Sequence, residues 1–237
     1  MGFLDIFKKN NADLQKQSET STVQNEPSKM LSVEEATGRL YNALAEYTGW
    51  KFLKSQRCLK KTIDDLVFEV NFSTSQWNKS FDTVYVYCEF SIWCKKFDKI
   101  SNGHSTVGYY KFEPINDYWH DISDEKKLSF AIERISNQMS ETILPLCKAF
   151  EEDFSNGVIL LTEEDNFKKY HISLRFLDIY AGREYVYKLA QNYINSLSYV
   201  CKQDIEKYKQ GDRSKPWMIN PSKNLKYIID NDLLDKR

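Results

Sequence analysis

The spacing of apolar residues changes along this chain from a period of two to a period of about 3.6, which strongly constrains the fold. In "DLVFEVNF", Phe68, Val70 and Phe72 alternate with polar residues, as in a β-strand with one buried face. Beyond residue 122 the apolar residues recur mainly at helical spacing. Strands followed by helices are typical of an α+β domain, in which helices pack on an antiparallel sheet.

Four segments within residues 50–114 predict an antiparallel sheet of about four strands, connected as a meander. They are "WKFLKSQRCLKK", "DLVFEVNF", "TVYVYCEFSIWC" and "VGYYKFEPI". Polar turns at about 74–82 and 98–106 suit hairpin connections. In the third segment Tyr85, Tyr87 and Trp93 share one face. This face is either covered by helices or exposed as a binding surface, and we expect helices to cover it, because large exposed apolar patches are unusual in monomers.

An N-terminal helix is predicted before the sheet. Ser32 and Glu35 have the spacing of a capping box, and apolar residues then recur at helical spacing to about Thr48. Gly49 follows and is a typical residue for ending a helix.

A helical block is predicted after the sheet, over residues 122–233. A long first helix should be kinked or restarted at Pro145. "GVILL" is either a fifth strand or part of the block, and Thr162 with Asp165 resembles the cap of a short helix. A helix over roughly 182–210 and a short one at about 222–233 complete the prediction.

The residues before the predicted N-terminal helix differ in composition from the rest of the chain. Residues 10–30 are rich in Asn, Gln, Ser, Thr, Glu and Lys, which is typical of a disordered linker. We therefore predict an amphipathic peptide at residues 1–9, a linker at 10–30 and a single α+β domain at 31–237.

The N-terminal peptide has the composition of a weak membrane anchor or a docking peptide. Full burial of a large apolar side chain gains at most about 1.5–3 kcal/mol, whereas ordering each residue costs about 1–2 kcal/mol. Membrane residence through this peptide alone would therefore be marginal. Its apolar and basic residues are Phe3, Leu4, Ile6, Phe7, Lys8 and Lys9.

Composition favours a cytoplasmic protein that does not bind nucleic acid. Lys plus Arg number 33 and Asp plus Glu 34, so the chain lacks the basic excess of a typical nucleic-acid-binding domain. Five scattered cysteines fit reduced thiols better than a disulfide framework. The sequence contains no apolar run long enough for a membrane-spanning helix. A peripheral position on the inner face of the membrane is the alternative, because residues 1–9 have the composition of a weak membrane anchor.

One histidine lies among carboxylates. In "NDYWHDISDE", Asp117, His120 and Asp121 surround Trp119, and a histidine beside a carboxylate can act as a general base. The same pattern suits the start of a helix, where Asp and Ser cap free N–H groups, and we favour that interpretation. The sequence has no nucleophile elbow, phosphate-binding loop or dinucleotide-binding motif, and it predicts no metal or cofactor.

The stretch from Leu44 to Phe90 resembles a family of small bacterial domains of unknown function, numbered four-three-zero-four. The resemblance rests on "GWKFLK" after the first helix and on "VNFSTSQW" in the strands. Trp50 stands where the family usually has Phe, and the C-terminal helices lie outside the resemblance. Related small α+β domains often look like immunity proteins, which neutralise a bacterial toxin by binding it.

These observations lead to three functional hypotheses. The first is a non-catalytic protein-binding domain, such as an immunity protein with a toxin as partner. The second is a peripheral membrane adaptor that uses residues 1–9, and the third is a hydrolase or nuclease centred on His120. The first hypothesis assigns partner contacts to Tyr85, Tyr87, Trp93, Asp117, Trp119, His120 and Asp121.

Overall fold

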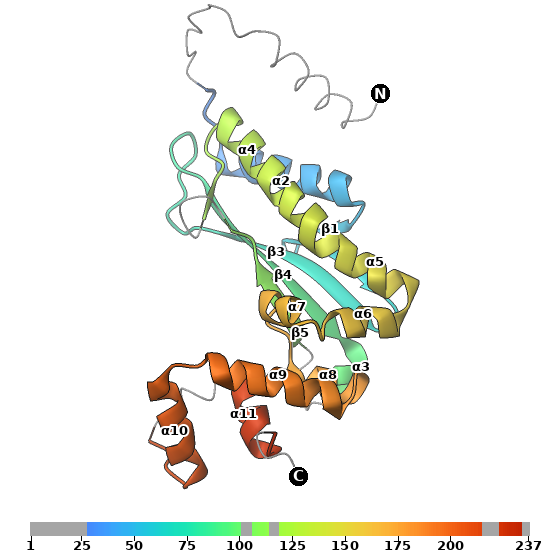
Figure 1. The fold of residues 1–237 in the computed structure, drawn as a ribbon. Coiled ribbons are helices and arrows are strands. Elements are labelled where there is room, and N and C mark those ends of the chain that lie inside the picture. The colour runs from blue at the N-terminus through green and yellow to red at the C-terminus, as the bar shows by residue number, and fades with distance from the viewer. Residues whose placement is uncertain (1–27, 101–105, 114–118, 215–222, 234–237) are drawn as a thin grey trace, which may run out of the picture.

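The computed structural model describes residues 28–100, 106–113, 119–214 and 223–233, and it confirms the α+β class (Figure 1). Strands β1 to β5 form an antiparallel meander in chain order, and β6 pairs with β4. The strands are β1 (Lys51–Leu53), β2 (Cys58–Ile63), β3 (Leu66–Thr74), β4 (Tyr85–Cys94), β5 (Thr106–Lys111) and β6 (His120–Asp121).

The meander was predicted, but two of its details differ. The first predicted strand is in fact two, β1 and β2, which pair through a turn at residues 54–57. Arg57 in that turn has a φ of 50°, which the sequence did not reveal because neither Gly nor Pro marks the turn. The predicted hairpin turn at 98–106 begins inside a short helix, α3 (Lys95–Ile100).

The N-terminal helix is α2 (Val33–Thr48), with the predicted ends. The Ser32 side chain accepts a hydrogen bond from the Glu35 backbone N–H, as in the first half of a capping box. Gly49 has a φ of 67° and its N–H donates to the Ala45 carbonyl. A side chain at Gly49 would be strained, so the glycine ends the helix for a conformational reason.

The long helix of the C-terminal block is interrupted where proline was expected to interrupt it. Helix α4 (Glu125–Gln138) passes into a π-helical turn (Met139–Ile143) and continues as α5 (Leu144–Glu152). Pro145 lies in the first turn of α5. The wider turn fits the missing N–H and the bulk of the proline ring.

The remaining helices settle one alternative and correct two predictions. "GVILL" belongs to the helical block and not to a fifth strand, and the side chain of Thr162 donates to the Ile159 carbonyl instead of capping the next helix. The predicted helix at 182–210 is two helices, because Ser198 caps a new one. These elements are α6 (Phe154–Leu160), α7 (Glu164–Lys169), α8 (Leu174–Tyr180), α9 (Arg183–Ser196), α10 (Tyr199–Lys209) and α11 (Lys223–Asp230).

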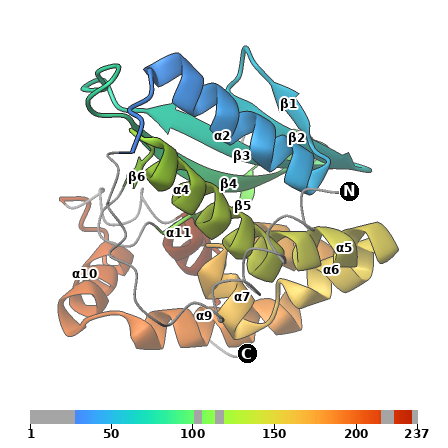
Figure 2. The ribbon, with the colours of Figure 1, turned by 90° about the horizontal axis from the view of Figure 1, so that it is seen from above.

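Helices α2, α4 and α5 pack on one face of the sheet (Figure 2). Phe68 and Phe90 lie on that face and are fully buried, and the ring centroid of Phe68 lies 5.8 Å from that of Phe150 in α5. Tyr41 of α2 packs in the same way on Phe72, at 4.5 Å. The main hydrophobic core therefore lies between the helices and one side of the sheet.

The outer edge of β5 is covered by the segment between α7 and α8. The Tyr109 N–H donates to the Tyr170 carbonyl at 2.8 Å, and the Ser173 N–H donates to the Val107 carbonyl at 2.7 Å. A Cβ atom at Gly108 would lie 2.6 Å from the Tyr170 carbonyl oxygen, so only glycine permits this close approach.

Residues 1–27 lie outside the described residues, and so does most of the predicted linker. Its last part, residues 28–30, belongs to the described structure: the Ser28 hydroxyl donates to Asp124, and Met30 forms a β-bridge with the same residue. Residues 28–30 therefore belong to the folded domain and not to the predicted linker. None of the described helices is both long enough and apolar enough to cross a membrane.

Candidate functional site

The face of the sheet opposite the helices carries most of the predicted binding residues. The strand register places Glu69 opposite Ser91, and Ser91 opposite Tyr109, so these residues share one face. By the same alternation Tyr85, Tyr87 and Trp93 of β4 lie on it. We call this surface the open face; its described members include Lys60, Val67, Glu69, Asn71, Tyr85, Tyr87, Glu89, Ser91, Trp93, Tyr109, Lys111, Trp119 and Asp121.

Sequence reasoning expected helices to cover this face, and that prediction was wrong. The hydrophobic core that the helices share with the sheet contains neither Tyr85, Tyr87 nor Trp93. Trp93 has 36% of its surface exposed. The open face is not a continuous apolar patch, because Glu89 and Ser91 separate Tyr87 from Trp93 along β4, and such a mixed surface tolerates solvent well.

Hydrogen bonds hold the side chains of the open face in position. The hydroxyl of the buried Ser91 accepts from Trp93 Nε1 at 2.9 Å and from Asn71 Nδ2 at 3.1 Å. Tyr87 Oη donates to Glu89 Oε2 at 3.1 Å. The aromatic groups are therefore ordered before any partner arrives.

Charges on the open face are largely balanced. Lys60 Nζ donates to Glu69 Oε1 at 2.8 Å across β2 and β3. Asp121 accepts from Ser123 Oγ at 2.6 Å and pairs with Lys127 Nζ at 2.8 Å. Burial raises the pKa of Asp121, but these hydrogen bonds outweigh burial and lower the pKa below its usual value.

Strand β6 adds two further predicted residues to the open face. Asp121 pairs with Tyr85 across the strands. The Trp119 ring meets the Tyr87 ring edge-on, with centroids 6.1 Å apart. The structure thus brings together Tyr85, Tyr87, Trp119 and Asp121 from segments more than 30 residues apart, while Asp117 lies outside the described residues.

His120 does not belong to this surface. It pairs with Val86 and is 4% exposed, on the helix side of the sheet. Among the described residues its Nε2 atom has no hydrogen-bond partner, and burial, aided by the positive charge of Arg134, lowers the pKa of His120 to about 4. His120 and Asp121 point to opposite faces, so these two residues do not form the base and carboxylate pair that the sequence left as the weaker alternative.

The neighbouring carboxylate has the capping role that the sequence favoured. Asp124 Oδ1 accepts from the backbone N–H groups of Lys126 and Lys127, at 2.8 and 3.0 Å, and so caps α4.

A hollow of about 560 Å³ adjoins the open face on its β5 side. Tyr109 and His171 form one wall, with stacked rings 4.4 Å apart, and α9 supplies Asn192 and Tyr193. Glu164 in the same hollow already bonds Lys168 and Asn192. The polar groups are thus partly satisfied internally, and they do not define one class of ligand.

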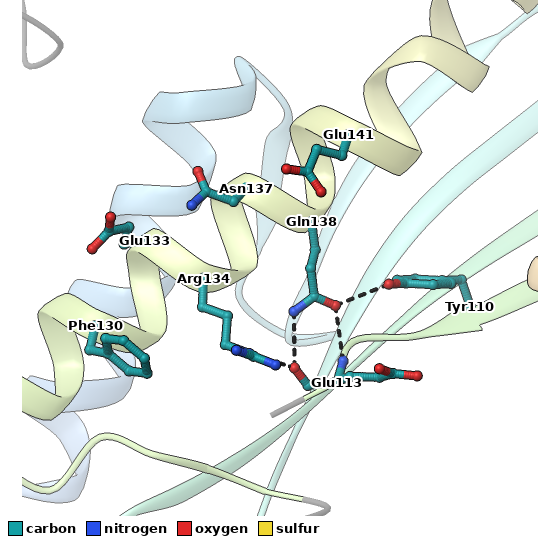
Figure 3. A pocket seen from close by; sticks show the side chains of 8 residues that line it. All are labelled: Tyr110, Glu113, Phe130, Glu133, Arg134, Asn137, Gln138 and Glu141. Atoms are coloured by element: carbon teal, nitrogen blue, oxygen red, sulfur yellow. Dashed lines mark hydrogen bonds between the residues drawn. The ribbon is translucent and has the colours of Figure 1, made fainter. Parts of the chain in front are cut away.

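A second hollow, of about 390 Å³, lies between α4 and the end of β5 (Figure 3). Gln138 is central to it: its Oε1 accepts from Tyr110 Oη and from the Glu113 N–H, both at 3.0 Å, and its Nε2 donates to the Glu113 carbonyl. Arg134 Nε donates to the same carbonyl at 2.7 Å. These hydrogen bonds connect the end of β5 to α4, so the polar groups of this hollow have a structural role.

Among the described residues no group of three His, Cys, Asp or Glu side chains is arranged to hold a metal ion. Sequence reasoning missed Tyr109 and Asn71 as members of the open face, although their alternation with buried neighbours could have identified them. It also did not single out Trp77 and Phe81 as exposed aromatic residues. The sequence signal for them is that two large aromatic residues stand inside a polar turn. The predicted peptide residues Phe3 to Lys9 lie outside the described residues.

Comparison of the chain with protein-family models, with curated proteins and with solved structures found no match.

Proposed function

We propose that this protein is a non-catalytic binding protein and that it contacts a protein partner with the open face of its sheet. The observation that carries the proposal is the group of aromatic side chains on that face, which the helices leave uncovered. Tyrosine and tryptophan are enriched at the centres of protein interfaces, where they bury large areas and still form hydrogen bonds.

The order of this surface supports the proposal further. Trp93 and Tyr87 are already hydrogen-bonded within the protein, so binding would lose little side-chain entropy. Two polar side chains, Asn71 and Glu89, lie beside the aromatic rings. Asn71 offers hydrogen-bond donor and acceptor groups and Glu89 offers acceptor oxygens, as the polar rim of an interface requires.

We propose that the partner is a bacterial toxin and that the protein binds it in the cytoplasm. Support comes from the resemblance of residues 44–90 to small bacterial domains of the kind that often look like immunity proteins. Nucleic acid fits less well, because Lys60 and Lys127 already pair with Glu69 and Asp121 and so offer little positive charge to phosphate groups.

The experiment is affinity purification of the tagged full-length protein from its native host, followed by mass spectrometry. We expect one stoichiometric partner. Tyr87→Ala and Trp93→Ala should each weaken its binding by about 10- to 100-fold, as expected for central aromatic residues of an interface. Circular dichroism should show that both variants remain folded.

Tyr199→Ala is the matched control, because Tyr199 is an aromatic residue on α10 with 74% of its surface exposed. A partner that both open-face variants retain at parental affinity would refute the proposal. So would equal loss in the Tyr199→Ala control.

A further inference from the structure

The hollow on the β5 side of the open face has the size of a small-molecule site. Its volume of about 560 Å³ lies within the range of about 300–1,000 Å³ that is usual for such sites. Strand β5 and helices α7 and α9 supply most of its lining. Three apolar residues that line it, Val107, Phe167 and Leu189, are buried, so the base of the hollow is apolar.

One wall of the hollow is a flat aromatic surface that is already fixed in place. The rings of Tyr109 and His171 stack with their centroids 4.4 Å apart and an angle of 10° between their planes. The backbone holds this pair, because the Tyr109 N–H donates to the Tyr170 carbonyl at 2.8 Å. The Ser173 N–H donates to the Val107 carbonyl at 2.7 Å on the other side of His171. His171 itself is exposed, so a ligand in the hollow can reach its ring.

The described residues that line the hollow present no unpaired charge. Glu164 and Lys168 lie in it and form an ion pair with each other. Burial, aided by the positive charge of Lys111, outweighs the opposite effect of Glu89 and lowers the pKa of His171. The imidazole is therefore neutral at pH 7, and an uncharged ligand fits the hollow better than a phosphate or an ammonium group does.

The polar groups of the hollow do not select a ligand by themselves, but the aromatic wall adds the requirement for a flat ring. Asn192 Nδ2 donates to Glu164 at 2.7 Å, which leaves Asn192 Oδ1 without a partner among the described residues. A heteroaromatic ring can stack on the wall with its face and donate from an N–H group at its edge to this oxygen. A purely aliphatic ligand would use neither feature.

We propose that this hollow binds an uncharged, planar heteroaromatic compound of the nucleobase or nucleoside class, stacked on the Tyr109 and His171 pair. Nucleobases have both a flat π-face and N–H groups at the edge, and aromatic side chains are the usual surface on which they stack. The fixed wall limits the entropy that binding would cost. Tyr87 and Trp93 do not line the hollow, so this site and the proposed protein interface can be tested independently.

The test is isothermal titration calorimetry of the full-length protein with adenosine, guanosine, cytidine and uridine. Ribose is the non-aromatic control, and adenosine 5′-monophosphate is the charged one. At least one nucleoside should bind, whereas ribose should not. The monophosphate should bind no more tightly than adenosine, because the one lysine that lines the hollow is already paired.

The variant His171→Asn removes the ring from the wall. His171 has a φ of 44°, and Asn tolerates this conformation. Affinity for the nucleoside should fall at least about fivefold, as expected when one aromatic stacking partner is lost. Phe81→Asn is the matched control, because Phe81 is an exposed aromatic residue with a φ of 62° that does not line the hollow. It should bind the nucleoside as the parent does.

Nuclear magnetic resonance of the parent protein gives a test that does not depend on how a variant folds. A stacked nucleoside should shift the assigned imidazole proton signals of His171 upfield through its ring current. The signals of His120, which is buried outside the hollow, should not move.

The proposal is overturned if none of the four nucleosides binds, or if ribose binds as tightly as they do. Equal affinity of the parent and the folded His171→Asn variant would also overturn it, as would nucleoside binding that leaves the His171 signals in place. If His171→Asn reduces capture of a protein partner while no nucleoside binds the parent, the hollow belongs to the protein interface, which contradicts the proposal as well.

Discussion

At the scale of single residues, His120 is the clearest case in which burial changes chemistry. Its imidazole is buried, its Nε2 atom has no partner in the part of the chain that the structure describes, and its pKa is lowered from 6.5 to about 4. The unfolded chain therefore takes up a proton between these two values, whereas the folded chain does not. Stability contributed by neutral His120 is present above pH 6.5 and is lost as the pH falls toward 4.

We expect this loss to reach roughly 3 kcal/mol, from the fall of the pKa from 6.5 to about 4 at 1.36 kcal/mol per pKa unit. The measurement is urea unfolding as a function of pH. In His120→Leu the part of the slope between pH 6.5 and 4 that His120 supplies should disappear. An unchanged slope in that variant would show that other groups cause the acid sensitivity.

At the scale of elements, the packing of α6 on α5 depends on a glycine. A Cβ atom at Gly157 would lie 2.3 Å from the Phe150 ring, whose other neighbours include Phe68. Gly38 in α2 differs, since a Cβ atom there has no neighbour within 4 Å.

Gly157→Ala should destabilise the protein by about 1–3 kcal/mol, because the added methyl group forces the ring to move. The matched substitution Gly38→Ala should instead stabilise it by about 0.5–1 kcal/mol through helix propensity. Thermal and urea unfolding of both variants would measure these changes. Equal effects of the two substitutions would mean that Phe150 yields without strain.

The elements also show what the sequence could predict. Strands β3 and β4 were predictable because their burial alternates residue by residue, as the apolar pattern does. The break between α9 and α10 was not predictable, because apolar residues continue at helical spacing past Ser198. Strand β6 was not predicted, because a strand of two residues is too short to show an alternating pattern. Its pairing with β4 depends on residues that are distant in the sequence.

The same contrast holds for the open face. Alternation along β4 is sufficient to place Tyr85, Tyr87 and Trp93 on one side of the strand. Which face the helices would cover was not predictable, because β4 has large side chains on both sides. The choice depends on β3 and on the helices, which bury Phe68 and Phe90.

At the scale of the whole molecule, stability is distributed unevenly. Strands β3 and β4 are central in the sheet and largely buried. Helix α10, in contrast, buries Ile205 in a small separate cluster with Leu225, and its first residues, Tyr199 and Val200, are exposed.

Hydrogen exchange should reflect this difference. We expect amide protection factors in α10 to be at least about 100-fold lower than in β3 and β4, because a helix with few buried contacts opens locally without global unfolding. Mass spectrometry of peptic fragments after exchange would resolve the two regions. Equal protection would mean that α10 opens only with the whole domain.

The chain-order meander has a consequence for synthesis on the ribosome. Each strand from β1 to β4 pairs with the next one made, and α2, made earlier, can already place Tyr41 over Phe72. Phe68 must wait for Phe150, and translation from Cys94 to Phe150 takes roughly 3 to 11 seconds at about 5–20 residues per second. During that interval part of the apolar face of the nascent sheet is bare, and chaperones would have most reason to bind there.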